Sequence, residues 1–150
     1  MSNVTARRAF LNVPPSLERI RAVSEWLQEH VRNWGAPVDV VDRLDLCLNE
    51  ALANALTHGG PSVHVCPLEL RLHYAESQDQ HTIVLTLQDG GMAFDPTQAQ
   101  VRPRARSLQD ASPGGLGIQM MRSHSDDLQY HRFNNKNQLD ILVRWKTDFP

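Results

Sequence analysis

The sequence predicts one α+β domain in which helices pack on a single face of a mixed, mainly antiparallel sheet. Its 150 residues fit a single domain, 1–150. Early in the chain, apolar side chains recur at helical spacing, and later segments alternate apolar and polar side chains as strands do. Such alternation is typical of a sheet with one covered face, so we expect two layers.

The first helix is expected over residues 16–34. Ser16 can cap its start, and Gly35 with Pro37 ends the run. Its apolar residues repeat at intervals of three or four, which places them on one face of the helix. These residues are Leu17, Ile20, Val23, Leu27, Val31 and Trp34.

The second helix is expected within residues 42–59. Glu50 and Asn54 lie four residues apart, so they share one face of this helix. At about 100° per residue, that face lies well over 90° from the centre of the apolar stripe. We therefore expect the helix to bury one side and to present the pair on another, where a carboxylate and a carboxamide can hold a metal and orient a nucleophile. The stripe consists of Leu44, Leu48, Ala51, Leu52 and Ala55.

Three strands are expected beyond the Gly59-Gly60-Pro61 segment. Residues 68–74, 82–87 and 139–145 each alternate apolar and polar side chains with a period of two. The segment between the second helix and the first of these strands has no clear periodicity, and we expect it to be irregular.

Asp89, Gly90 and Gly91 directly follow the second expected strand. A carboxylate at a strand end can accept a hydrogen bond, and glycines let the backbone approach a flat ligand closely. Asp-Gly is also one of the commonest turn dipeptides, so an ordinary turn is the favoured interpretation of this segment alone. His58, at the end of the second helix, either contacts a site here or simply ends the helix.

A polar stretch, residues 96–113, is too long for an ordinary tight connection and is expected to form a lid. It contains three arginines, at positions 102, 104 and 106. The glycine-rich segment after it, 114–117, opens a predicted short helix, and free amide groups at a helix start bind phosphate well. A lone glycine-rich turn is weak evidence for such a site.

Composition excludes several classes of function. The formal net charge is −2, so the chain lacks the basic excess that neutralises a nucleic-acid backbone. Neither Lys136 nor Lys146 follows a glycine-rich loop, which excludes a Walker-type P-loop. No stretch approaches the roughly 18 apolar residues that a membrane span requires, and we expect a cytoplasmic protein. Cys47 and Cys66 are expected to be structural thiols.

The order of the motifs is more specific than any motif alone. Three motifs follow one another: a helix with Glu50 and Asn54, then Asp89-x-Gly91 after a strand, then Gly115-x-Gly117 opening a helix. This order resembles that of the ATP-binding domain shared by gyrase, Hsp90, histidine kinases and MutL, which is called the GHKL or Bergerat fold. The phrases Asn-Glu-Ala-Leu-Ala-Asn-Ala-Leu-Thr-His-Gly, Phe-Asp-Pro and Gly-Gly-Leu-Gly-Ile most resemble the stand-alone anti-sigma-factor serine/threonine kinases of the partner-switching type. The resemblance covers about residues 10–145.

This resemblance implies a role for each matching residue. Asn54 corresponds to the asparagine that binds the Mg²⁺ bridging the ATP phosphates, and Glu50 to the general base toward the attacking serine hydroxyl. Asp89 corresponds to the aspartate that accepts from the adenine amino group. The remaining expected nucleotide-binding residues are Gly91, Phe94, Gly114, Gly115, Leu116 and Gly117, with Arg104 or Arg106 as a cation for the γ-phosphate. The alternative for the two arginines is that they are solvated.

One residue departs from the family pattern. Ala93 stands where the first glycine box commonly has a second glycine, so either the local backbone differs or that glycine was dispensable. This departure makes nucleotide turnover less certain than nucleotide binding.

The resemblance leaves three hypotheses for the function. The favoured one is a kinase that phosphorylates a serine on an anti-anti-sigma protein of the STAS type and that sequesters a sigma factor. The second is a catalytically weak ATP- or ADP-binding module that acts by sequestration alone. The third, a detached histidine-kinase catalytic domain, would need a phosphoacceptor helix pair, and gyrase- or MutL-like activity would need a transducer domain. The family's tendency to form homodimers is implied only by resemblance, and no direct nucleic-acid or membrane partner is expected.

Overall fold

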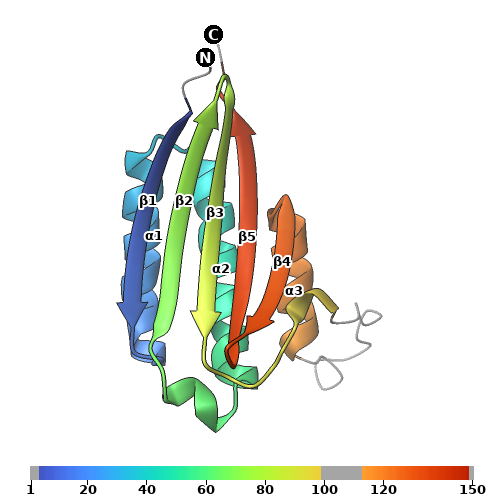
Figure 1. Cartoon of the computed structure of the whole chain (residues 1–150). Coiled ribbons are helices and arrows are strands. Elements are labelled where there is room, and N and C mark those ends of the chain that lie inside the picture. Colours follow the sequence, from blue (N-terminus) through green and yellow to red (C-terminus); the bar gives the residue numbers. More distant parts are fainter. Residues whose placement is uncertain (1–3, 99–112, 149–150) are drawn as a thin grey trace.

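The computed structural model describes residues 4–98 and 113–148 and has the predicted two-layer α+β architecture (Figure 1). The sheet has five strands in the order β1-β2-β3-β5-β4. All neighbouring strands pair antiparallel, so the predicted admixture of parallel pairing is wrong. The strands are β1 (Thr5–Val13), β2 (Leu68–Ser77), β3 (Gln80–Asp89), β4 (Asp127–Phe133) and β5 (Lys136–Lys146).

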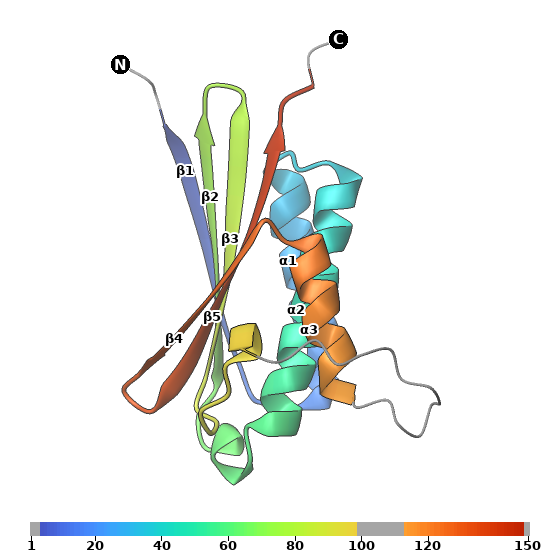
Figure 2. The same cartoon turned by 90° about the vertical axis from the view of Figure 1, so that its right-hand side faces the viewer.

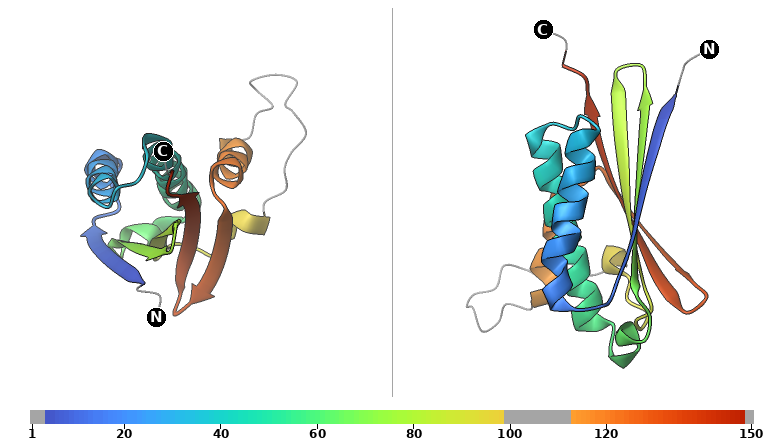
Figure 3. Two further views of the ribbon diagram at one scale, coloured as in Figure 1. Left: turned by 90° about the horizontal axis from the view of Figure 1, so that it is seen from above. Right: turned by 90° about the vertical axis from the view of Figure 1, so that its left-hand side faces the viewer.

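Helices cover only one face of this sheet. They lie side by side as a single layer, and none of the described helices lies on the opposite face (Figures 2 and 3). In the described part of the chain, no helix has the length and apolar character to cross a membrane. The α-helices are α1 (Ile20–Asn33), α2 (Val38–His58) and α3 (Pro113–His124), and the 3-10 turns are η1 (Leu17–Arg19), η2 (Pro61–His64) and η3 (Pro96–Gln98).

Both predicted N-terminal helices are present with shifted starts. Ser16 Oγ accepts from the Glu18 amide at 3.3 Å, but the cap opens the 3-10 turn η1, and the α-helix begins at Ile20. Gly35, with φ of +86°, ends the segment after α1 in a conformation that favours glycine. Helix α2 begins at Val38, earlier than predicted, because the extended backbone of Pro37 can directly precede a helix.

The three predicted strands are confirmed, whereas β1 and β4 were not predicted. Both are edge strands, and most of their side chains are exposed or only half-buried, so their sequences lack a clear apolar alternation. β4 and β5 form a hairpin whose turn residues, Asn134 and Asn135, have φ of +50° and +58°. Asparagine tolerates this left-handed conformation, which tight hairpins with right-handed strand twist require.

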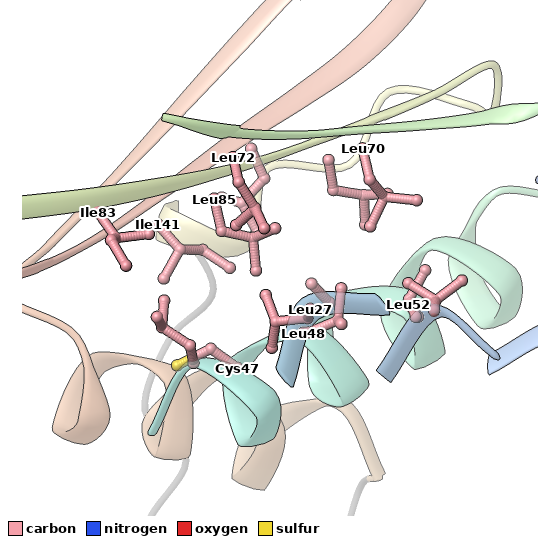
Figure 4. Packing of buried hydrophobic residues seen from close by; sticks show 14 of the residues in the cluster. Leu27, Cys47, Leu48, Leu52, Leu70, Leu72, Ile83, Leu85 and Ile141 are labelled. Carbon is pink, nitrogen blue, oxygen red and sulfur yellow. The ribbon is translucent and has the colours of Figure 1, made fainter. Parts of the chain in front are cut away.

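The core fills the space between the helix layer and the sheet (Figure 4). The predicted stripe of α2 is buried throughout and meets the inward side chains of the central strands, such as Leu85 and Ile141. Cys47 is buried in this layer, and burial raises the pKa of its thiol to about 11. Its predicted role as a small core residue agrees with this position, because a thiol that stays protonated is unreactive.

Replacing Leu48 by alanine tests this core. Leu48 is fully buried on α2, so Leu48→Ala should lower the free energy of unfolding by about 2–5 kcal/mol through lost burial and the resulting cavity. Urea denaturation followed by circular dichroism measures the change. Val38→Ala is the control, because Val38 lies on the same helix with 76% of its surface exposed and should shift stability by less than about 0.5 kcal/mol. Equal losses in the two variants would contradict the assignment.

Candidate functional site

Asn54 is a buried polar residue of α2 without a complete set of hydrogen bonds. Only 9% of its surface is exposed, and its Nδ2 has no hydrogen-bond partner among the described residues. A buried amide without a partner destabilises a fold by about 1–3 kcal/mol. The prediction that Asn54 lies on a face separate from the buried one is therefore wrong. Helix α2 lies between α1 and α3 and over the sheet, so a residue well away from its apolar stripe is still covered.

The Asn54 side chain lines a small cavity between α2 and the sheet. The cavity has a volume of about 30 Å³, and Asp89, Phe94, Tyr130 and Asn137 also line it. Asn54 comes from the helix layer, Asp89 from the end of β3, and the others from the following loop and the β4–β5 hairpin. The structure thus brings together Asn54, Asp89 and Phe94, three of the predicted site residues.

Asp89 is the last residue of β3 and is 7% exposed. Its Oδ1 accepts hydrogen bonds from the Gly91 amide at 2.8 Å and from Asn137 Nδ2 at 3.0 Å. Burial raises the pKa of Asp89, while these two hydrogen bonds and the nearby charge of Arg132 oppose the rise. Within the described residues no hydrogen bond reaches Oδ2, so this oxygen is available to a donor.

Gly91 permits a close approach between the loop after β3 and the end of α2. A Cβ at position 91 would lie 2.7 Å from Gly59 Cα and 2.9 Å from Asp89 Oδ1. The same contact includes a hydrogen bond from the Met92 amide to the Gly59 carbonyl at 2.8 Å. A glycine is therefore required at position 91, because any side chain there would collide with the Gly59 backbone and the Asp89 carboxylate.

Ala93 is not strained. The non-glycine residues with positive φ in the described chain are Gln78, Asn134 and Asn135, so Ala93 has an ordinary backbone conformation. The backbone conformation at position 93 therefore does not require a glycine.

Glu50 lies one helical turn from Asn54 but faces α3. A Cβ built on Gly117 would collide with Glu50 Oε2, so the carboxylate rests against the α3 backbone. Gly117 is thus a predicted site residue that the structure places beside Glu50. Glu50 and Asn54 diverge, since Asn54 lines the cavity toward Asp89 and Glu50 does not.

The predicted glycine-rich helix start is confirmed. α3 begins at Pro113, so Gly114, Gly115 and Leu116 belong to its first turn. Amide groups in the first turn of a helix lack intrahelical acceptors and favour anions. Of the predicted lid, residues 96–98 form η3, whereas Arg104 and Arg106 lie outside the described residues.

His58 and Phe94 form an aromatic pair beside the cavity. Their ring centroids are 4.3 Å apart and the rings are nearly parallel, at 14°. His58, the last residue of α2, therefore contacts the loop after β3. This contact fits the interpretation in which His58 touches the segment around Asp89, rather than the one in which it only ends the helix.

Three residues of the β4–β5 hairpin that the sequence does not predict as site residues lie at the cavity or beside it. Asn137 bonds Asp89, the Tyr130 hydroxyl donates to Asn137 Oδ1, and Arg132 donates to the Gly91 carbonyl at 2.8 Å. A signal for Asn137 was present, because it is polar yet in phase with the buried residues Leu139 and Ile141 of the same strand. Tyr130 and Arg132 had no such signal, because β4 itself was not predicted.

The chain is similar to known proteins over most of its length. Residues 13–144 match the family described as histidine kinase-like ATPase domain. The chain is also similar to the serine/threonine-protein kinase BtrW of Bordetella bronchiseptica, with 38% identity over 119 residues, which covers 77% of this chain and 79% of BtrW.

Two solved structures share the fold. A Mycobacterium tuberculosis protein, solved as its RsbU and RsbW domains, matches 91% of this chain with a TM-score of 0.63 and 13% identity, and the match spans 32% of that protein's chain. A chain of the SiaB-SiaC complex from Pseudomonas aeruginosa matches with a TM-score of 0.59 and 13% identity, covering 90% of this chain and 88% of the matched chain. At this level of identity the likeness establishes the fold.

The raised pKa of Asp89 predicts a pH-dependent gain of stability in Asp89→Asn. Because the folded carboxyl binds a proton more readily than the unfolded one, whose ordinary value is 3.8, the wild type loses stability as pH rises through the folded pKa. The neutral variant avoids this loss, so its advantage should be largest at neutral pH and should vanish as pH falls to about 4.

Urea denaturation between about pH 4 and about pH 8 measures this difference. Asp42→Asn is the matched control, since Asp42 lies exposed on α2 and should show no such gain. A gain for Asp89→Asn that grows toward acid pH would contradict the assignment.

Proposed function

The chain belongs to the histidine kinase-like ATPase domain family and, within it, to the serine/threonine-protein kinases related to BtrW, and from this we propose its function. We propose that it is a partner-switching anti-sigma-factor kinase that transfers a phosphoryl group from ATP to a serine of an anti-anti-sigma protein of the STAS type. The resemblance to the partner-switching kinases implies this class of partner, and the matched chain of the SiaB-SiaC structure, which shares the fold, also belongs to a protein complex.

One observation supports the proposal above the others. Among the described residues, buried Asn54 Nδ2 and Asp89 Oδ2 have no hydrogen-bond partner, and Asn54, on the same helix as Glu50, lines one cavity with Asp89. An unsatisfied amide and a partly satisfied carboxylate are costly in a core, and a ligand with matching polar groups would satisfy both.

Asp89 suits recognition of the adenine base. Its Oδ2 can accept from an exocyclic amino group, while Gly91 and Asn137 hold the other oxygen. The cavity of about 30 Å³ has room for about one water molecule, so a purine enters only if the wall opens. Phe94, which is half-buried, and Met92, which is 58% exposed, both line the cavity, and we infer that this part of the wall moves.

The two ends of the Asn54 carboxamide suit a Mg²⁺-phosphate group: the unpartnered Nδ2 would donate to a phosphate oxygen, and Oδ1 would bind the Mg²⁺ ion. The described residues contain no cluster of three or more histidine, cysteine or acidic side chains that could hold a metal alone. A single carboxamide oxygen would instead share the ion with phosphate oxygens and water, a ligand set typical of Mg²⁺. When bound, the ion would neutralise charge on the transferring phosphoryl group.

Glu50 is the proposed general base. In the transfer, the serine Oγ attacks the γ-phosphorus, the bond from that phosphorus to the β–γ bridging oxygen breaks, and ADP leaves. The hydroxyl proton passes to the Glu50 carboxylate. Because the α3 backbone at Gly117 borders this carboxylate, its position is restricted on that side. The first-turn amides of α3, from Gly114 to Leu116, are proposed to bind phosphate oxygens, with Arg104 or Arg106 as a candidate cation.

Sequestration of a sigma factor when the anti-anti-sigma partner is phosphorylated is the second half of the proposal. The alternative is a module that binds ATP or ADP and acts by sequestration without transfer. The ordinary backbone at Ala93 removes the main structural reason to favour that alternative.

The overall proposal is tested by incubating the protein with Mg²⁺, ATP and candidate partners encoded beside it. Mass spectrometry should find phosphoserine on one partner. Tight ATP-dependent binding without phosphoserine would support the sequestration module instead.

Glu50→Gln tests the general base. The amide cannot accept the hydroxyl proton, so phosphoryl transfer should fall by about 10²-fold or more, while ATP affinity should stay within a few-fold of the wild type. Radiolabelled phosphate transfer and calorimetry measure the two quantities. Asp42→Asn on the same helix is the charge-matched control. Unchanged transfer in Glu50→Gln would rule out this role.

Asn54→Ala tests the metal site. Removing the carboxamide should abolish most of the Mg²⁺ dependence of ATP binding, because the ion then lacks its protein ligand. Calorimetry with and without Mg²⁺ measures this linkage. Asn49→Ala is the control, since the Asn49 amide bonds the Asp45 carbonyl of its own helix at 2.8 Å. The role is refuted if Asn54→Ala and the wild type respond equally to Mg²⁺.

A further inference from the structure

The β4–β5 hairpin places three polar side chains around Asp89. Arg132 and Asn137 are directly paired across the two strands, and Tyr130 lies two residues earlier on the same face. The turn at Asn134 and Asn135 sets this register, because the tight hairpin joins the two strands directly. The hairpin therefore places Tyr130, Arg132 and Asn137 together at one side of the cavity.

The contacts of Asn137 determine the orientation of its carboxamide. One end of the group faces three donors: the Tyr130 hydroxyl, Arg132 Nη1 at 3.1 Å and the Phe94 amide at 3.4 Å. The other end faces three acceptors: Asp89 Oδ1 at 3.0 Å, the Met92 carbonyl at 2.8 Å and the Gly91 carbonyl at 3.5 Å. Guanidinium and backbone N–H groups only donate, and a carbonyl only accepts. The oxygen must therefore face Arg132, and the NH₂ group must face Asp89.

This orientation assigns different roles to the two oxygens of Asp89. Oδ1 accepts from Asn137 and from the Gly91 amide, so it is already committed as an acceptor. Oδ2 is left for a ligand, and an ionised carboxylate oxygen can only accept. An amino group on a purine can donate to it, whereas a carbonyl oxygen at the same position would face it lone pair to lone pair.

We propose that Asn137, held by Tyr130 and Arg132, is a positioning residue that makes the site select a 6-aminopurine over a 6-oxopurine nucleotide. The inference rests on the proposed function, in that it takes the Asp89 cavity as the base site. Asn137 acts through Asp89, by keeping that carboxylate oriented and ionised.

Core packing alone does not explain an asparagine at this position. Asn137 is 6% exposed and is in phase with Leu139, Ile141 and Val143, which are buried apolar residues. A buried carboxamide is unfavourable unless its donors and acceptors are satisfied. Here the hydrogen bonds of Asn137 join the hairpin to both the Asp89 side chain and the loop after it.

The test compares the affinities of ATP and inosine triphosphate, which carries a carbonyl in place of the amino group. The dissociation constants are measured by calorimetry for the wild type, Asn137→Ala and Tyr130→Phe. The wild type should prefer ATP. Asn137→Ala should reduce that preference about tenfold, the size expected from losing one hydrogen bond to a charged group, and Tyr130→Phe should reduce it by about threefold.

Gln138→Ala is the matched control. Gln138 is the next residue of β5, points to the other face of the sheet and bonds Arg71 at 3.1 Å, so the variant should keep the wild-type preference. A purely structural role for Asn137 would weaken both nucleotides equally and leave their ratio unchanged.

The outcomes separate the two proposals. If the wild type binds neither nucleotide, the proposed function itself fails. If the wild type binds both equally, or if it prefers ATP and Asn137→Ala keeps that preference within about twofold, the selectivity role is overturned while nucleotide binding stands. Should Asn137→Ala fail to fold, Tyr130→Phe decides, since it removes only a hydroxyl and an unchanged ratio there overturns the proposal.

Discussion

The backbone contact between Gly59 and Gly91 joins the helix layer to the sheet layer at the candidate site. Gly59 follows the last residue of α2, and Gly91 follows the end of β3 by two residues. No side chain fits between them, since a Cβ at position 91 would lie 2.7 Å from Gly59 Cα. Because the two backbones touch, Asn54 on the last turns of α2 and Asp89 at the end of β3 line one cavity. A larger residue at position 91 would separate the groups that the proposed nucleotide site requires.

The two polar residues of α2 serve different neighbours because the helix is enclosed by different elements on different sides. Asn54 lies over the sheet, whereas Glu50 lies against α3 at Gly117. In the proposed mechanism this separation is useful, since one residue binds the metal and the other receives a proton. Glu50 and Asn54 are separated by a rise of about 6 Å along the helix, and their different directions would place them at two parts of the proposed ligand.

The candidate site is built from groups that weaken the unliganded fold. Asn54 Nδ2 is buried without a partner among the described residues, and burial raises the pKa of Asp89. Both features have the same physical cause, which is a polar group held where water is scarce. The β4–β5 hairpin compensates in part, because Asn137 and Arg132 supply a hydrogen bond and a positive charge near Asp89. Bound nucleotide would supply the missing hydrogen-bond partners of these buried polar groups, so nucleotide binding would stabilise the fold.

The sequence by itself determined the helix layer, the three central strands and the family, because these features depend on local periodicity and on motifs read along the chain. Asp89 and the start of α3 were also predictable, since each directly follows or opens a strongly patterned element. Tertiary structure decided what depends on contacts between distant segments. The edge strands β1 and β4 form by pairing with neighbours rather than from their own alternation. Three features of the site likewise arise only when helix, loop and hairpin pack together: the burial of Asn54, the ordinary backbone at Ala93 and the hydrogen bond from Asn137 to Asp89. Asn137 and Asp89 are 48 residues apart in the chain.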